Sequence, residues 1–203
     1  KLFQGTNPPS EAYLILQKEV GKKFLGGIFN KETQSSLILK PFYDLKIIHE
    51  FKPFDFYPMP SVRVVMLKFR KKDDPDIELG HRKLYEDFII YSFNQWKPNL
   101  KLALNKIFSN LQFKLLSKNL MFKTDSKPSD LTFEQWLKLF SQFLVLVPGF
   151  KQDVVRGSEE RLKNNQRLMR KNNFRLKSNL EANFRHTRIK STYIEKRSQL
   201  CKC

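Results

Sequence analysis

Cysteine is scarce in this chain of 203 residues: Cys201 and Cys203, with one lysine between them, are its only two. Two cysteines are too few for a disulfide framework, and this pair is too close in sequence for an ordinary structural bridge. We therefore expect free thiols in a reducing compartment.

Long apolar runs are missing as well. The longest, residues 140–147, falls well short of the ~18 residues that a membrane-spanning helix needs. No membrane span is therefore expected.

Negative charge is also in deficit, because the chain has 38 Lys and Arg but only 20 Asp and Glu, which gives a formal net charge of +18. Such an excess favours an anionic partner, with nucleic acid as the first candidate and an anionic membrane surface as the second.

Signatures of catalysis are absent too. The chain has neither a phosphate-binding loop nor a Gly-x-Gly-x-x-Gly sequence, so nucleotide hydrolysis would lack its usual cradle. The three histidines have no zinc-type spacing to one another or to the cysteines. Four carboxylates, Asp73, Asp74, Asp76 and Glu78, directly follow three basic residues, so we expect a solvated, locally neutralised turn and no metal site. We predict no catalytic residues and no cofactor.

Between residues 61 and 150 the pattern predicts one α/β domain. A β-branched run at 62–69 predicts a strand, and residues 80–96 carry apolar side chains at helical spacing. Three short apolar runs then predict three further strands, at 100–108, 111–116 and 120–123. A second helix is expected from about Asp130, with Thr132-Phe133-Glu134-Gln135 as an alternative capping box and Pro148-Gly149 as its stop. The predicted order is β-α-β-β-β-α, with Phe88 and Trp136 in the core.

That order, with Gly80-His81-Arg82-Lys83-Leu84-Tyr85 opening the helix and Lys97-Pro98-Asn99-Leu100 opening the next strand, resembles a small thioredoxin-like domain. Several mitochondrial ribosomal proteins and an accessory subunit of respiratory complex I share this domain. The chain departs from the family pattern, because Leu84 stands where Phe is usual and Lys97 replaces an Asn. The redox form of the fold carries Cys-x-x-Cys at the start of the first helix, and residues 73–82 contain no cysteine. The resemblance thus implies a redox-inert fold.

Residues 1–60 are predicted to form an N-terminal arm. A helix is expected from about Ser10 to Leu25, after a proline pair and before Gly26-Gly27. From Lys40 onward, four prolines interrupt a segment rich in Phe and Tyr, which suits an extended chain that docks aromatic side chains instead of pairing in a sheet. Two alternatives stay open: these aromatic side chains cover the protein's own core, or they dock on a partner.

Residues 151–203 are predicted to form a basic helical extension. They hold 15 Lys and Arg against five Asp and Glu, so +10 of the net charge lies there. Ser158-Glu159-Glu160 predicts a helix start with acidic side chains at the N-terminus. The extension either lies in solvent as a charged face or contacts RNA phosphates. The predicted RNA-binding residues are Arg161, Lys163, Arg167, Arg170, Lys171, Arg175, Lys177, Arg185, Arg188 and Lys190.

The sequence thus predicts a docking arm (1–60), an α/β (α+β) thioredoxin-like domain (61–150) and a basic helical extension (151–203). The resemblance implies a non-enzymatic structural constituent of the mitochondrial ribosome in the mitochondrial matrix. Its partners would be ribosomal RNA and other mitochondrial ribosomal proteins, with no small-molecule substrate. The alternative is a non-catalytic accessory subunit in the matrix arm of complex I, and a third class is a matrix enzyme or nuclease.

Overall fold

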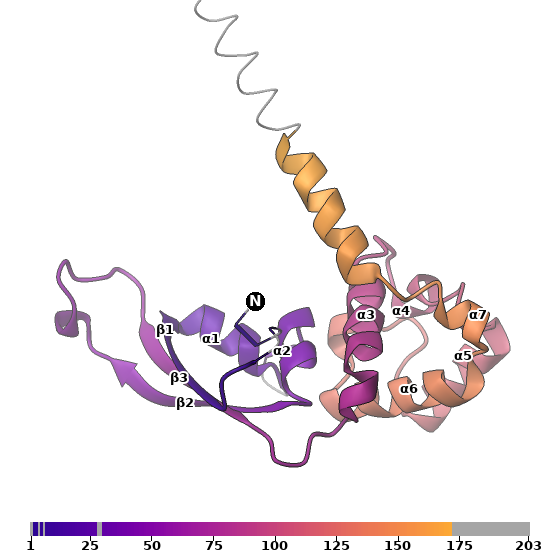
Figure 1. The fold of residues 1–203 in the computed structure, drawn as a ribbon, viewed down its shortest axis with the longest axis horizontal. Coiled ribbons are helices and arrows are strands. Elements are labelled where there is room, and N and C mark those ends of the chain that lie inside the picture. The colour runs from indigo at the N-terminus through magenta and orange to yellow at the C-terminus, as the bar shows by residue number, and fades with distance from the viewer. Residues whose placement is uncertain (1, 4, 6, 28–29, 172–203) are drawn as a thin grey trace, which may run out of the picture. The chain divides into compact units, whose positions relative to one another are not determined.

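A computed structural model describes residues 2, 3, 5, 7–27 and 30–171 of the chain. By its contacts the chain divides into two units, Lys1–Glu159 and Glu160–Cys203. The first unit joins a three-stranded sheet to a group of helices that follows it in sequence (Figure 1). The predicted thiols at Cys201 and Cys203 lie outside the described residues.

The sheet consists of β1 (Glu11–Gln17), β2 (Tyr43–Phe51) and β3 (Val64–Lys71) in the order β1-β3-β2, with both pairs antiparallel. The central strand alternates, because Val65, Leu67 and Phe69 are fully buried while the side chains between them are partly exposed. This period of two is what a sheet covered on one face requires. The strand predicted from residues 62–69 is confirmed.

Helices α1 (Lys18–Leu25) and α2 (Gln34–Leu39) follow β1, and α1 packs on the buried face of the sheet. The ring centroids of Phe24 and Phe69 lie 5.8 Å apart. A Cβ on Gly21 would come within 3.0 Å of a methyl group of Val65, so glycine lets α1 approach the strand closely. Thr33 and Ser36 form a capping box that starts α2.

The helix predicted from Ser10 to Leu25 is correct only for its second half. Residues 11–17 form β1, whose backbone pairs with β3 from Glu11↔Arg70 to Gln17↔Val64. The run contains apolar side chains that fit either period, and pairing satisfies the backbone groups along an otherwise open edge of β3. The expectation that residues after Lys40 avoid a sheet is also wrong, because the prolines flank β2 without interrupting it.

The helical part contains α3 (Arg82–Phe93), α4 (Leu100–Ala103), α5 (Asn110–Asn119), α6 (Phe133–Leu146) and α7 (Gly149–Gln152). Residues 158–171 are also helical. Short 3₁₀ turns occupy Pro53–Asp55, Leu79–His81 and Pro128–Asp130. The two helices predicted in this region are confirmed as α3 and α6, and Thr132 and Gln135 form the predicted capping box of α6.

The three strands predicted between residues 100 and 123 are wrong, because α4 and α5 occupy most of this segment. Two polar residues that precede apolar runs, Asn99 and Ser109, are helix N-caps. The Asn99 side chain accepts a hydrogen bond from the Leu102 amide at 3.0 Å, and Ser109 and Gln112 form a reciprocal capping box. The order β-α-β-β-β-α is therefore not formed, and no thioredoxin-like sheet is present in the described residues.

The core of the helical part is aromatic. Phe88 of α3 packs against three rings of α6, with centroid distances of 4.8 Å to Phe143, 5.7 Å to Phe140 and 6.0 Å to Trp136. Phe88 and Trp136 are both fully buried, as predicted, but they meet between two helices and not over a sheet.

Helix α3 also ties the helices to the N-terminal sheet layer. The buried Tyr85 hydroxyl donates to the carbonyl oxygen of Leu37 in α2 at 3.0 Å, and burial raises the Tyr85 pKa. At the other end of α3, the Asn94 amide donates to the Gln34 side chain at 2.7 Å. Two specific bonds therefore fix α3 against α2.

Candidate functional site

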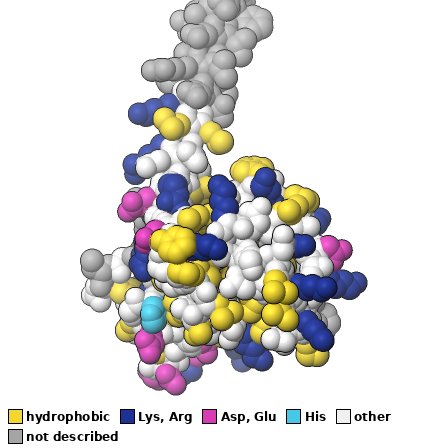
Figure 2. Space-filling view, turned by 90° about the vertical axis from the view of Figure 1, so that its right-hand side faces the viewer, with side chains coloured by type: hydrophobic (Ala, Val, Ile, Leu, Met, Phe, Trp, Pro, Cys, Tyr) yellow, Lys and Arg dark blue, Asp and Glu magenta, His cyan; other side chains and the backbone are white. Residues whose placement is uncertain are grey.

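The helical part carries a lysine-rich surface. Between residues 96 and 127 the sequence has seven lysines and a single acidic residue, Asp125. Six of these lysines are exposed: Lys97, Lys106, Lys114, Lys118, Lys123 and Lys127. Figure 2 shows the side of the molecule that lies to the right in Figure 1, where basic side chains are interspersed with exposed apolar ones. We call these six lysines, with Trp96, the helical basic surface.

Trp96 is the most unusual residue of this surface. Its side chain is 94% exposed, and its backbone adopts φ +53°, a left-handed conformation that is uncommon for a bulky residue. It precedes Lys97 and Pro98, which line an open hollow together with Phe93, Lys127 and Pro128. An exposed indole beside lysines matches the combination by which proteins stack bases and hold phosphates of single-stranded nucleic acid.

The predicted RNA-binding residues lie partly in the described helix at 158–171. Arg161, Lys163, Arg167, Arg170 and Lys171 are all exposed there. The other five predicted residues, Arg175, Lys177, Arg185, Arg188 and Lys190, lie outside the described residues. The sequence prediction missed the helical basic surface, although the run of seven lysines with one acid was a detectable signal.

A buried carboxylate holds the start of the 158–171 helix. Asp87 of α3 accepts hydrogen bonds from the backbone amides of Gly157 and Glu159, each at 2.9 Å. Lys83 forms an ion pair with Glu159. Asp87 thus caps a helix that begins about 70 residues later in the chain, which the local start signal at Ser158 did not reveal. Burial raises the pKa of the neighbouring Glu86 carboxyl, and the hydrogen bond from Arg82 opposes this rise.

The aromatic side chains between residues 42 and 57 are divided between the core and the surface. Phe42 is buried, and Phe51 and Phe56 are partly buried against each other with centroids 5.3 Å apart. Phe54 and Tyr57 are exposed, Tyr57 completely. Part of the aromatic segment therefore covers the protein's own core, and the tip of the loop between β2 and β3 offers aromatic rings to the outside.

The acidic and histidine side chains of the described residues do not gather into a metal site. These residues contain no group of three or more His, Cys, Asp or Glu side chains placed to hold a metal ion. Lys72 forms an ion pair with Asp76, with 2.6 Å between Nζ and Oδ2, in agreement with the predicted locally neutralised turn. No helix in the described part of the chain is both long and apolar enough to cross a membrane.

Comparison with known proteins decides the family. The model of the family described as ribosomal RNA adenine dimethylase matches residues 1–144, which include the whole sheet and the helices through most of α6. This chain belongs to that family. An rRNA adenine N-6-methyltransferase of Bacteroides fragilis is 26% identical over 152 residues, which cover 68% of this chain and 57% of the relative. A ribosomal RNA small subunit methyltransferase A of Persephonella marina is 23% identical over 135 residues, which cover 66% of this chain and 48% of the relative.

Solved structures of Rossmann-like rRNA methyltransferases share the fold. The 23S rRNA methyltransferase ErmE matches with a TM-score of 0.60 and 17% identity over 70% of this chain and 57% of its own. A dimethyladenosine transferase from Plasmodium falciparum matches with a TM-score of 0.51 and 16% identity over 71% of this chain and 61% of its own. The chain spans about half the length of the curated relatives that it matches.

These findings correct the sequence-based assignment. The resemblance to the thioredoxin-like domain is wrong, because the family model and the solved structures place the same residues in a different family and fold. A structural constituent of the mitochondrial ribosome and an accessory subunit of complex I are both contradicted, since the matched family is named for catalysis. The prediction of a non-enzyme is wrong for the same reason.

Proposed function

We propose that this chain acts in the N6-methylation of adenine in ribosomal RNA, and that its described part supplies an RNA-binding surface for that reaction. The observation that carries the proposal is the family match, which runs without interruption from the sheet into the helical part. The net charge of +18 and the helical basic surface support an RNA partner independently of that match. Among the predicted partners, ribosomal RNA is retained, whereas nothing supports mitochondrial ribosomal proteins. The mitochondrial matrix location is untested and stays a prediction.

Methyl transfer to adenine needs a methyl donor, and S-adenosylmethionine is the small molecule that this family implies, contrary to the expectation of no small-molecule substrate. In open α/β sheets such ligands bind outside the carboxyl ends of parallel strands, next to a glycine-rich turn. The described strands pair only in antiparallel fashion, and no glycine-rich turn follows any of them. The hollow beside Arg82 is lined by Lys71 and Lys72 and by only one carboxylate, Asp73, so its lining is net positive and does not suit a sulfonium cation. The described residues therefore do not fit this cofactor.

The described residues fit the handling of RNA. Lysines of the helical basic surface contact phosphates, which position an RNA without reading its sequence. Enzymes that modify a base take it out of the stack and hold it against aromatic side chains. Trp96 and Tyr57, both almost fully exposed, are the aromatic rings that this chain offers to unstacked bases.

The contribution of Trp96 is testable by substitution. Trp96→Ala is expected to weaken the binding of a single-stranded rRNA fragment by about 1–3 kcal/mol, the usual worth of one base stacked on an aromatic ring. Stability should stay within about 0.5 kcal/mol, because the side chain is exposed. Fluorescence anisotropy with labelled RNA measures the first effect and urea unfolding the second. Leu111→Ala, another exposed apolar truncation, is the matched control; equal RNA affinities of the two variants would remove Trp96 from the site.

The activity itself is tested in the source cells. Deleting the gene that encodes this chain should remove N6-methylated adenine at one or more rRNA positions, as read by mass spectrometry of digested rRNA. Re-expression of the gene should restore the modification. An rRNA with unchanged adenine methylation after the deletion would contradict the proposed function.

A further inference from the structure

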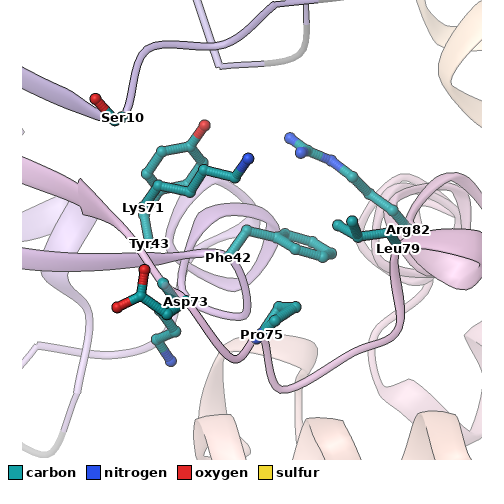
Figure 3. A pocket seen from close by; sticks show the side chains of 9 residues that line it. Ser10, Phe42, Tyr43, Lys71, Asp73, Pro75, Leu79 and Arg82 are labelled. Atoms are coloured by element: carbon teal, nitrogen blue, oxygen red, sulfur yellow. The ribbon is translucent and has the colours of Figure 1, made fainter.

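A hollow of about 300 Å³ lies where β3 ends and α3 begins, and no residue of the helical basic surface lines it. Figure 3 shows its lining. Phe42, Pro75 and Leu79 supply an apolar wall. The polar lining has three cations and one carboxylate, so it is net positive: Lys71, Lys72, Arg82 and Asp73, with the hydroxyls of Ser10 and Tyr43. In this view the Lys71 ammonium, the Arg82 guanidinium and the Tyr43 hydroxyl point toward the same part of the hollow. Volumes near 300 Å³ are at the lower end of those that hold small ligands.

The Tyr43 hydroxyl is the first sign of a ligand. Tyr43 is 1% exposed, and its hydroxyl oxygen is the one buried side-chain polar atom of the described residues that has no hydrogen-bond partner. Buried hydroxyls almost always have a partner, because an unsatisfied one costs free energy. Burial raises the Tyr43 pKa, and the Arg82 guanidinium, which lies close to the hydroxyl without forming a well-aligned hydrogen bond, opposes that rise, so the hydroxyl keeps its proton near neutral pH.

The second sign is a fixed guanidinium. Arg82 donates to the Phe3 carbonyl oxygen at 2.6 Å and to the Glu86 carboxylate at 3.1 Å, and it lies 4.5 Å from the centroid of the Phe42 ring. These contacts hold the group in place but use only part of its five N–H donors. A guanidinium that is held this way is suited to bidentate recognition of an oxyanion.

The third sign is a lysine without an ion pair. Along the end of β3, Arg70 pairs with Asp44 at 2.9 Å and Lys72 pairs with Asp76 at 2.6 Å. Lys71 stands between them, is exposed, and makes no ion pair within the described part of the chain. Its charge is therefore available to a ligand in the hollow.

We propose that this hollow is a phosphate-binding site, in which Arg82 and Lys71 hold the anion and the Tyr43 hydroxyl donates to one of its oxygens. The apolar wall of Phe42, Pro75 and Leu79 then accommodates the sugar or base that carries the phosphate. The phosphate belongs either to a bound RNA strand or to a free mononucleotide, since both present the same oxyanion. The site rests on these contacts alone and does not depend on methyl transfer.

The test uses the full chain and thermal unfolding at matched ionic strength. Sodium phosphate and adenosine monophosphate should each raise the melting temperature relative to sodium chloride, and adenosine, which lacks the phosphate, should not. Lys71→Gln should weaken phosphate binding about tenfold or more, as expected for loss of a charged hydrogen-bonding partner. Lys138→Gln removes an exposed positive charge that belongs neither to the hollow nor to the helical basic surface, and it should leave phosphate binding unchanged.

The Tyr43→Phe variant distinguishes a hydroxyl that binds phosphate from a hydroxyl that only stabilises the fold. Without phosphate, this variant should melt at the same temperature as the parent or higher, because it removes a hydroxyl that has no partner. With phosphate, it should gain less stabilisation than the parent. Competition then identifies the source: an rRNA fragment that displaces adenosine monophosphate indicates a backbone phosphate, and unaffected mononucleotide binding indicates a free nucleotide. The proposal is overturned if phosphate stabilises no more than chloride, or if Lys71→Gln and Tyr43→Phe respond to phosphate as the parent does.

Discussion

Phe88→Ala is expected to lower the free energy of unfolding by about 3–5 kcal/mol, the usual cost of truncating a fully buried phenylalanine. Phe88 has no exposed surface and lies within ring contact of Trp136, Phe140 and Phe143, so its loss leaves a cavity between α3 and α6. Because domains are usually stable by only ~5–15 kcal/mol, the variant should be marginal or unfolded at 25 °C.

Urea unfolding followed by circular dichroism measures this effect on the full chain. Phe150→Ala is the matched control, because the same truncation falls on a side chain that is 71% exposed and should cost less than about 0.5 kcal/mol. If the two variants unfold at the same urea concentration, the aromatic core between α3 and α6 is not what stabilises this part of the molecule.

Deleting residues 158–203 is expected to produce the largest change in RNA binding. The deleted segment holds 13 Lys and Arg against four Glu, which is +9 of the net +18, and each phosphate contact contributes about 0.7–0.9 to the slope of log K against log[salt]. Five phosphate contacts would alone account for a slope of about 3.5–4.5 in log K against log[salt]. The five residues are Arg161, Lys163, Arg167, Arg170 and Lys171. Affinity at low salt should therefore fall steeply in the truncated chain, and the residual salt dependence should be shallower.

A charge-neutralised variant separates charge from helix structure. Replacing Arg167, Arg170 and Lys171 by glutamine keeps the length of the chain and should lower the slope by about 2–3. The change should be similar for different RNA sequences, because phosphate contacts do not read bases. An unchanged slope in both the truncated and the neutralised proteins would place RNA binding entirely on other surfaces.

The sequence predicted individual elements better than their assembly. The period-two pattern of β3, the apolar stripes of α3 and α6, and the capping box at Thr132 were all detectable, because each depends on local spacing. The segment 100–123 was misassigned because short apolar runs fit a strand or a helix equally well, and Asn99 and Ser109 act as helix caps where turns were expected. β1 was missed because its pairing with β3, about 50 residues away in sequence, overrides local propensity.

The candidate sites also differ in whether they depend on local sequence or on the assembled fold. The basic C-terminal segment was visible from composition alone, since charge needs no fold to be counted. The hollow beside Tyr43 could not be found from composition, because it brings together residues of β2, β3 and α3. It also depends on which hydroxyl is left without a hydrogen-bond partner. The family assignment failed because it relied on an element order in which three of the elements are not strands.

The central claim is that the described part of this chain binds ribosomal RNA and does not by itself hold the methyl donor. Isothermal titration of the same purified chain with an rRNA fragment and with S-adenosylmethionine tests both halves in one experiment. We expect saturable RNA binding that weakens as salt is raised, and no saturable binding of S-adenosylmethionine. Stoichiometric binding of S-adenosylmethionine, or RNA binding that does not respond to salt, would contradict this claim.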